Sequence, residues 1–307
     1  MSSSTSSIPV ADPDPSTPIP FPDLTGKIVW VSKDCIANGG NSSIYAGKLV
    51  IPGGETIKVA IKVLRCNGNS CDPAIILAVR RRLERESNVW HGFDHPNLLQ
   101  FLGMATDLAF SSTFPTLISP YCERKSVLEY IKAHPEVIRL PIILGVAKGL
   151  QYLHSRDAIH GDIRASNVLM GDNGEPLLCD FGRCKVLGSR GYTTDFACAY
   201  RYMPPEILNW KPAPDSTESK PMTTRESDVY AFGLIAFEVL SGLVVYHGKG
   251  DHTVYKHVSA GRHPAKEDCQ NPDIESFWSM LEECWNKDPA QRPTIDKVMK
   301  HLRGIPA

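Results

Sequence analysis

The stretch His160–Asn167 reads HGDIRASN and carries a carboxylate, Asp162, and an amide, Asn167. The triplet Asp180-Phe181-Gly182 follows it at a short distance along the chain. Between them lie two short apolar runs joined by a turn of Gly, Asp and Asn: Val168–Met170 and Leu177–Cys179. Because apolar runs interrupted by such a turn are typical of paired strands, the pattern predicts a short hairpin with a loop carboxylate at each end.

This layout resembles the catalytic loop and the D-F-G segment of protein kinases, which implies ATP-dependent phosphoryl transfer. By this resemblance, Asp162 orients the substrate hydroxyl and accepts its proton, and Arg164 lies near the transferring phosphate. Asn167 and Asp180 would hold Mg²⁺, since carboxylate and amide oxygens are the hard ligands that this ion prefers. The reaction itself needs little covalent work from the protein, mainly positioning and charge compensation.

A lysine and a glutamate of the expected kind occur upstream. The alternating segment 58–62, sequence KVAIK, predicts a strand that ends in Lys62, the position at which kinases hold the α- and β-phosphates. Such a lysine needs a carboxylate partner, and the apolar periodicity over 73–91 predicts a helix that offers Glu84 and Glu86. Counting back from the following H-P-N turn favours Glu86, with Glu84 as the alternative.

The segment around residue 39 is similar to a kinase glycine-rich loop, in which backbone amides approach phosphates without a Cβ in the way. In that register only the middle glycine, Gly39, is kept, and Ala37, Ser42 and Ile44 replace the first glycine, the third glycine and the valine. By itself the segment also fits an ordinary Gly-Asn hairpin. The resemblance implies nucleotide contacts at Ile36, Ala37, Asn38, Gly39, Gly40 and Ile44.

Two further strands are predicted, over 98–104 and 114–121, and the second leads into a segment similar to a kinase hinge. The resemblance makes Ser119 the small residue at the back of the adenine site. It implies adenine hydrogen bonds with the carbonyl of Pro120 and the amide of Cys122. The remaining expected adenine contacts are Tyr121 of the hinge and, above and below the ring, Ile44, Ala60 and Leu169.

Later motifs imply structural roles. The helix that begins with SDVYAFG places Asp228 where kinases brace the catalytic loop backbone. Near the C-terminus the C-W-x-x-D-P-x-x-R-P pattern contains Arg292, which the resemblance pairs with Glu206. Four rings are expected to form a spine between two lobes: Phe101, Trp90, Phe181 and His160.

Composition bounds the architecture. The 307 residues are 42% hydrophobic with a net charge of −1, which argues against a nucleic-acid binder with a broad basic surface. No apolar run is long enough to predict a membrane span, and the first residues do not resemble a signal peptide. The nine cysteines do not follow a zinc-binding pattern, which favours free thiols and a cytoplasmic location. Residues 1–24, rich in Ser and Pro, are expected to be a disordered tail. We expect an α+β, bilobal kinase domain over 25–303, with a β-rich N-lobe (about 25–120) containing one main helix and a mostly helical C-lobe (about 121–303).

Departures from the pattern leave alternatives open. Gly161 replaces the arginine that senses activation-loop phosphate in many kinases, which favours activity independent of that phosphate. The catalytic loop is similar to that of tyrosine kinases, but tyrosine-kinase-like proteins are mostly serine/threonine enzymes, so a serine/threonine protein kinase acting as a monomer is favoured. A tyrosine-specific kinase, a pseudokinase that serves as an ATP-binding module or scaffold, and a small-molecule kinase remain alternatives.

Overall fold

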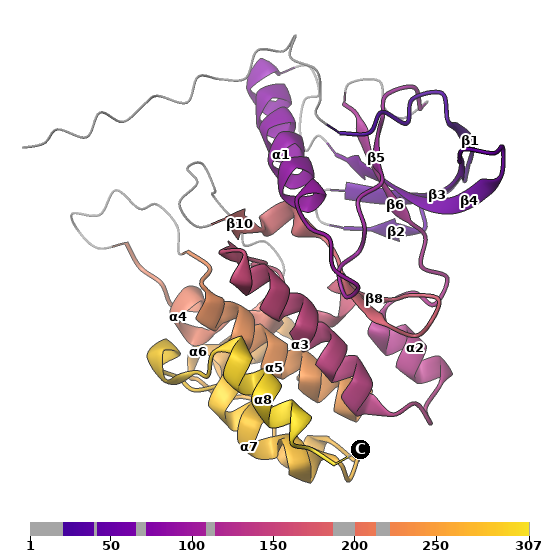
Figure 1. Ribbon diagram of the computed structural model, residues 1–307. Helices are drawn as coiled ribbons and strands as arrows, with labels where there is room; N and C mark the ends of the chain where they lie inside the picture. The colour runs from indigo at the N-terminus through magenta and orange to yellow at the C-terminus, as the bar shows by residue number, and fades with distance from the viewer. Residues whose placement is uncertain are drawn as a thin grey trace, which may run out of the picture.

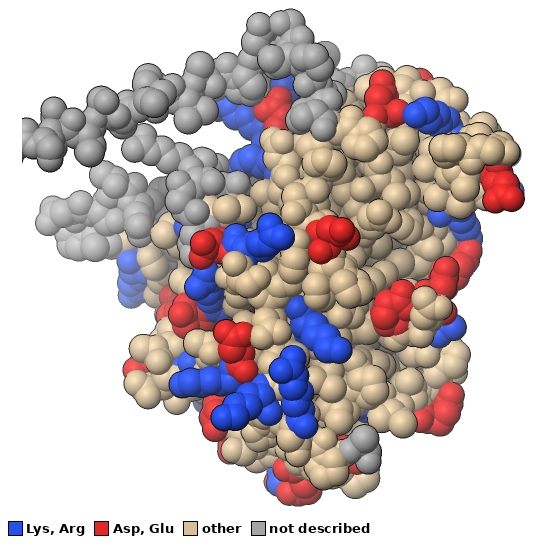
Figure 2. Space-filling model, in the orientation of Figure 1, with Lys and Arg blue, Asp and Glu red and all other residues tan. Residues whose placement is uncertain are grey.

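The computed structural model describes residues 21–39, 42–65, 72–108, 114–186, 200–212 and 222–306. They form two lobes, a curled antiparallel sheet with one long helix above a mostly helical lobe (Figure 1). This confirms the predicted α+β, bilobal fold. No helix in the described ranges is both long enough and apolar enough to cross a membrane. On the face shown in Figure 2, side chains of both charge signs are interspersed over the two lobes.

The N-lobe sheet has the strand order β1-β3-β4-β6-β5, with β2 added to β3. Its strands are β1 Ile28–Val31, β2 Ala37–Asn38, β3 Ser42–Val50, β4 Thr56–Leu64, β5 Gly103–Ala105 and β6 Thr116–Pro120. Antiparallel pairing sets Ile44 opposite Lys62 and Ala60 opposite Ser119. Since side chains alternate between the faces of a strand, Ala60 and Lys62 share one face of β4 with Ile44 across from them.

Helix α1 spans Pro73–His91, as the apolar periodicity predicts, and buries Leu83, Val89 and Trp90. The predicted strand over 98–104 is wrong for most of its length, because regular pairing starts only at β5. The backbone amide of Leu99 instead donates to the carbonyl of Leu178, 2.8 Å away, in the other lobe. This apolar run therefore connects the lobes rather than extending the sheet.

The C-lobe is built around α5, Arg225–Ser241, whose residues from Ser227 to Leu240 are all buried. A helix that is apolar over most of its surface is stable only inside a core, and α2 Val127–Ala133, α3 Arg139–Ser155 and α7 Ile274–Cys284 pack against it. The remaining helices of the lobe are α4 Pro205–Leu208, α6 Asp251–Ser259 and α8 Ile295–Arg303. The strands are β7 Ala158–Ile159, β8 Val168–Met170, β9 Pro176–Leu178 and β10 Lys185–Val186, with β8 paired to β9 as predicted.

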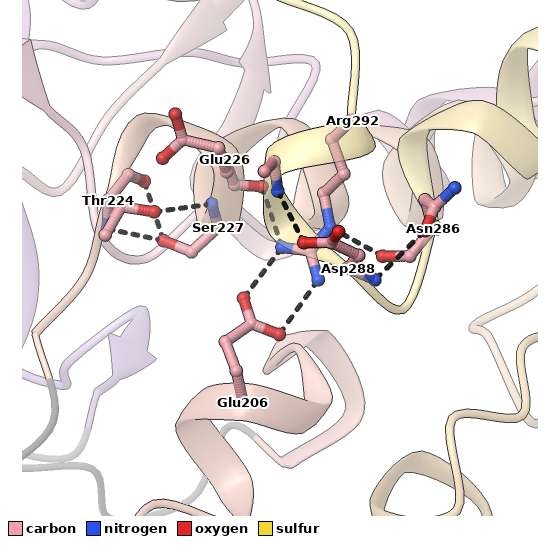
Figure 3. Close-up of polar contacts among 8 residues, drawn as sticks. Glu206, Thr224, Glu226, Ser227, Asn286, Asp288 and Arg292 are labelled. Carbon is pink, nitrogen blue, oxygen red and sulfur yellow. Dashed lines mark hydrogen bonds and ion pairs between the residues drawn. The ribbon is translucent and has the colours of Figure 1, made fainter.

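The Glu206–Arg292 ion pair fastens α4 to the C-terminal part of the lobe (Figure 3). Arg292 Nη1 and Nη2 donate to Glu206 Oε1 and Oε2 over 2.7 and 2.8 Å, a two-pronged geometry that suits guanidinium and carboxylate. Arg292 also donates to the backbone carbonyls of Asn286 and Glu226. The predicted pairing is therefore present, with a fully buried arginine side chain.

Part of the expected tail packs on the sheet. Residues 21–24 are described, Leu24 is buried, and its amide donates to the carbonyl of Met104 over 2.7 Å. The rest of the expected tail, 1–20, lies outside the described residues, as do Gly40 of the glycine-rich segment and residues 187–199.

Candidate active site

Lys62 on β4 stands between two carboxylates at the junction of the lobes. Its Nζ forms ion pairs with Glu86 Oε1 of α1 and with Asp180 Oδ1, the latter at 2.7 Å. Glu86, and not the alternative Glu84, is the α1 residue in this cluster. Burial alone would lower the pKa of Lys62, but attraction to Asp180 and Glu86 outweighs it and raises the pKa above its ordinary value. Lys62 is therefore a fixed positive charge.

The same cluster holds Asp180 in its ionised form. Burial opposes ionisation, but the charge of Lys62 and its hydrogen bond lower the pKa of Asp180 well below the ordinary range. Asp180 is in the left-handed backbone region at φ 66° and accepts from the amide of Gly182. A Cβ on Gly182 would lie 2.9 Å from Glu86 Oε2, so the glycine allows the close approach of this segment to α1.

Asp228 at the start of α5 organises the backbone of the catalytic-loop segment. Its Oδ2 accepts from the amide of His160 at 2.8 Å and lies 3.0 Å from His154 Nε2, and its Oδ1 accepts from the amide of Gly161 at 2.9 Å. Asp228 is buried, and backbone amides satisfy its charge, as a buried carboxylate requires. The bracing role expected from the sequence is thus present as three short contacts.

Asp162 and Asn167 face each other across the loop. Asn167 Nδ2 donates to the backbone carbonyl of Asp162 over 2.9 Å and to its Oδ2 over 3.2 Å. With the amide nitrogen used in this way, Asn167 Oδ1 is left as an oxygen acceptor. No three His, Cys, Asp or Glu side chains gather into a metal site within the described ranges. The carboxylate of Asp180 and the amide oxygen of Asn167 are hard donors that fit an ion such as Mg²⁺, which takes one or two protein oxygens and completes its shell with phosphates and water.

Arg183 is a neighbour of Asp162 that the sequence analysis missed. Its Nη1 lies 3.5 Å from Asp162 Oδ1, so both carboxylate oxygens of Asp162 face nitrogen donors. The sequence signal that could have indicated this contact is the position of Arg183 directly after the D-F-G triplet. Arg164, expected near the phosphate, precedes the short helical turn Ala165–Asn167, and its Nε is buried without a hydrogen-bond partner among the described residues. A buried cationic donor of this kind favours an anion nearby.

The segment after β6 contains the backbone groups that the sequence analysis expected to contact adenine. The amide of Tyr121 is used in pairing, because it donates to the carbonyl of Lys58 over 3.2 Å. The flanking Pro120 carbonyl is approached only by Ser119 Oγ, at 3.4 Å, among the described contacts. Burial raises the pKa of the Cys122 thiol to about 11, so this side chain is a neutral thiol at neutral pH.

The glycine-rich segment forms the hairpin that its register predicts. Ala37 pairs with Ile44 and Asn38 with Ser43, and the amide of Gly39 closes the turn on the carbonyl of Ser42 over 2.9 Å. The side chain of Arg65, which the sequence analysis did not consider, donates to the carbonyl of Gly39. Leu169 lies on β8, and Ile36 precedes β2 with its side chain about half exposed.

The four rings of the expected spine are in contact. Trp90 lies 5.1 Å from Phe101 and 5.9 Å from Phe181, measured between ring centroids, and Phe181 lies 5.5 Å from His160. The column joins α1 to the D-F-G segment and the catalytic loop. Because α1 carries Glu86, the stack also restrains the Lys62 cluster.

Comparison with known proteins agrees with this arrangement. Residues 31–302 match the family described as protein tyrosine and serine/threonine kinase. The chain is 27% identical, over 88% of its length, to the tyrosine-protein kinase transforming protein RYK of avian retrovirus RPL30, and covers 60% of that protein. It is 26% identical over 88% of its length to the serine/threonine-protein kinase STY46 of Arabidopsis thaliana, covering 43% of it. It is 28% identical to the human ephrin type-A receptor 8, over 88% of the chain and 25% of the receptor.

The chain thus spans about 60% or less of the length of these three curated relatives, and their names include both tyrosine and serine/threonine kinases. The family match covers both lobes, the hairpin with Asp162 and Asp180, and the helix that presents Glu86. This chain belongs to the protein tyrosine and serine/threonine kinase family.

Proposed function

We propose that this protein transfers the γ-phosphate of ATP to a hydroxyl group of a protein substrate. The observation that carries the proposal is the ion-pair cluster in which Lys62 joins Glu86 and Asp180 beside the braced loop of Asp162. A protein that only used the fold as a scaffold has no physical need to bury these charges together, since burying ion pairs costs desolvation energy.

Each residue has a role in the proposed reaction. Lys62 binds the α- and β-phosphates, and Glu86 keeps its long side chain in place. Asp162 orients the substrate hydroxyl and takes up its proton, and the positive charge of Arg164 lies near the transferring phosphate. Asn167 and Asp180 would hold Mg²⁺, which when bound compensates the charge of the phosphates.

The adenine would lie between Ile44 and Ala60 on one side and Leu169 on the other. The carbonyl of Pro120 is the acceptor for its amine and the amide of Cys122 the donor to its ring. Tyr121 holds the hinge to β4 through its amide, and the small side chain of Ser119 leaves room behind the ring. In this proposal the phosphates are covered by the glycine-rich segment, with Ile36, Ala37, Asn38, Gly39 and Gly40.

Transfer to serine or threonine is favoured over transfer to tyrosine. The support is the similarity to tyrosine-kinase-like sequences and to a plant serine/threonine kinase. Phosphoamino-acid analysis of the labelled product tests this choice. We expect phosphoserine or phosphothreonine, and phosphotyrosine alone would overturn the assignment.

The rival is a pseudokinase, and one contact favours it. Arg183 and Asn167 occupy the two carboxylate oxygens of Asp162, so a substrate hydroxyl has to displace or share one of these contacts. The depleted glycine-rich segment, with Ala37 and Ser42 in place of glycines, points the same way.

Phosphate transfer from labelled ATP decides between the two functions. Purified protein is incubated with Mg²⁺ and generic protein substrates, beside an Asp162→Asn variant that keeps the size of the side chain. Because a positioned general base contributes about 10²- to 10⁴-fold, we expect the variant to lose at least about 100-fold in rate. If both proteins bind ATP but transfer equally little phosphate, the kinase hypothesis is wrong and the pseudokinase hypothesis is supported.

The proposal includes protein substrates as partners, a monomer, and a cytoplasmic location. Six cysteines in the described ranges are free thiols, which supports a reducing compartment. Size-exclusion chromatography with light scattering and localisation of the tagged full chain test these two points.

A further inference from the structure

The segment Phe21–Gly26, here called the N-terminal strap, is fastened to the edge of the N-lobe sheet. The amide of Met104 on β5 donates to the carbonyl of Pro22 over 3.0 Å, and the amide of Leu24 donates to the carbonyl of Met104 over 2.7 Å. Asp23 thereby pairs with Met104 in parallel orientation. The strap is thus joined to the edge of the sheet by one parallel bridge, although its sequence has the composition of a tail.

The sheet is shaped to receive the strap. Gly103 has φ +143°, and a Cβ at this position would lie 2.2 Å from the carbonyl oxygen of Pro22. Only glycine allows this approach. Further on, Thr25 Oγ1 lies 3.1 Å from Thr106 Oγ1, and the amide of Gly26 donates to Asp107 Oδ2 over 2.9 Å. These contacts fix the strap along its whole length.

Phe21 extends from the strap into a cluster of rings. It meets His91 with centroids 5.2 Å apart and Phe101 with centroids 5.7 Å apart, both edge to face at 68° and 85°. His91 is the last residue of α1, and Phe101 begins the stack described above. Edge-to-face pairs of this kind stabilise beyond the area that they bury. Phe21 therefore contacts α1 and the column of rings at once.

Helix α1 is the element that these contacts restrain. Trp90, which follows Phe101 in the column, lies one helical turn after Glu86, and residues four apart share a helix face. Trp90 Nε1 also donates to the carbonyl of Leu99 over 2.6 Å. In Figure 1, α1 runs alongside the sheet down to the junction of the lobes. Because Glu86 lies on the same helix, a displacement of the C-terminal turn of α1 would disturb the Lys62–Glu86 ion pair.

We propose that Phe21 is a positioning residue that holds α1, and through Glu86 the Lys62 cluster, in the arrangement needed for phosphate transfer. This inference rests on the proposed function. The alternative is that the strap only covers the exposed edge of β5, as edge strands often require. The backbone bonds of Pro22 and Leu24 to Met104 are enough to cover this edge. Phe21 precedes these bonds and instead contacts the rings of His91 and Phe101.

The inference agrees with the glycine at position 161. A phosphate sensor in the loop is one way for a kinase to hold its helix, and Gly161 has no side chain for that task. Phe21 contacts Phe101 at one end of the four stacked rings, whereas Gly161 follows His160 at the other end. Control of activity would then depend on whether the strap is seated.

Hydrogen–deuterium exchange of the amides of residues 86–91 tests the strap directly. The full chain is compared with Phe21→Ala, with Phe21→Tyr, and with Trp30→Ala, an exposed aromatic residue elsewhere on the N-lobe. Two lost edge-to-face pairs should speed exchange in Phe21→Ala by at least about fivefold. Phe21→Tyr keeps an aromatic ring and should exchange the amides of residues 86–91 at the wild-type rate, as should Trp30→Ala.

A second variant displaces the strap without touching Phe21. Gly103→Ala places its Cβ against Pro22, while Gly53→Ala, at φ +103° with nothing within 4 Å, carries backbone strain alone. We expect faster exchange in α1 for Gly103→Ala only. Unchanged exchange of residues 86–91 in both Phe21→Ala and Gly103→Ala would overturn the proposal.

Activity measurements separate this inference from the proposed function. The rate of phosphate transfer should fall in Phe21→Ala and recover in Phe21→Tyr. Absence of transfer in the wild type defeats the proposed function, while the exchange experiment still reports on the strap. Conversely, if the wild type is active but the exchange of residues 86–91 is unchanged in both Phe21→Ala and Gly103→Ala, only the positioning role of Phe21 is wrong.

Discussion

Gly161 donates its backbone amide to Asp228 Oδ1 over 2.9 Å while its own φ is +74°. The contact ties the catalytic loop to the start of the buried helix α5. It also sets the direction in which the next residue, Asp162, leaves the backbone.

Replacing Asp228 by Asn should lower both activity and stability. One carboxylate oxygen becomes an amide nitrogen that faces the backbone amide of either His160 or Gly161, so one buried donor loses its acceptor. We expect a loss of about 1–3 kcal/mol in the free energy of unfolding and a reduced kcat. Urea unfolding and phosphate-transfer rates measure these effects, with Asp251→Asn on the exposed start of α6 as the control. A variant as stable and active as wild type would contradict the bracing role.

A side chain at position 161 should impair catalysis. In Gly161→Ala the Cβ would lie 3.0 Å from the carbonyl oxygen of Arg183 and 3.2 Å from Thr223 Oγ1. Gly248 has φ +75° with nothing within 4 Å, so Gly248→Ala carries the same backbone strain without crowding. The backbone strain alone should cost each variant about 1–2 kcal/mol of stability. Only Gly161→Ala should also lose activity, and equal activities would show that crowding at Arg183 is unimportant.

Phosphorylation of the loop threonines should be dispensable. Thr193 and Thr194 lie outside the described residues, and the prediction rests on Gly161, which lacks the side chain that binds a loop phosphate in many kinases. The double variant Thr193→Ala, Thr194→Ala should keep most of the wild-type kcat. Mass spectrometry of both proteins establishes their phosphorylation state beforehand. Complete loss of transfer in the double variant would refute the argument from Gly161.

The Glu206–Arg292 pair should couple strongly in a double-mutant cycle. Removing Glu206 leaves the fully buried guanidinium of Arg292 without its charge partner, which costs about 3 kcal/mol or more. Removing both partners should cost less than the sum of the single losses, with a coupling of about 1–3 kcal/mol. Urea unfolding of Glu206→Ala, Arg292→Ala and the double variant gives the cycle. Additive losses would mean that the two side chains act independently.

Glu238 should make stability depend on pH. Burial raises the pKa of this carboxyl to about 7, although Val245 and Tyr202 donate to it and Arg201 lies nearby. Since the folded protein holds the proton more tightly than the unfolded chain, stability falls as pH rises from the unfolded pKa to the folded one and then levels off. The expected loss over this range is on the order of 3 kcal/mol. Unfolding at pH 5 and pH 7.5 measures it, and Glu238→Gln should abolish this slope.

Local patterns in the sequence were sufficient for helix α1 and for the hairpin of β8 and β9. The apolar periodicity over 73–91 predicts α1 with its observed ends, because a helix is stabilised by neighbours three and four residues away. The hairpin of β8 and β9 follows from a turn between two apolar runs in the same way. The resemblance to kinases then assigns Lys62, Glu86 and Asp228 to partners far along the chain.

Tertiary structure decided which groups from distant segments share one place. The run from Leu98 to Phe101 looks like a strand, but the amide of Leu99 donates to the carbonyl of Leu178 in the other lobe, and a periodic pattern does not reveal such a partner. Arg183 approaches Asp162 only because the D-F-G turn folds back on the loop. Phe21 has the sequence context of a tail, and its contacts with His91 and Phe101 arise because Gly103 admits the strap. Local sequence specifies which elements form, whereas long-range packing and hydrogen bonding determine which side chains those elements bring together.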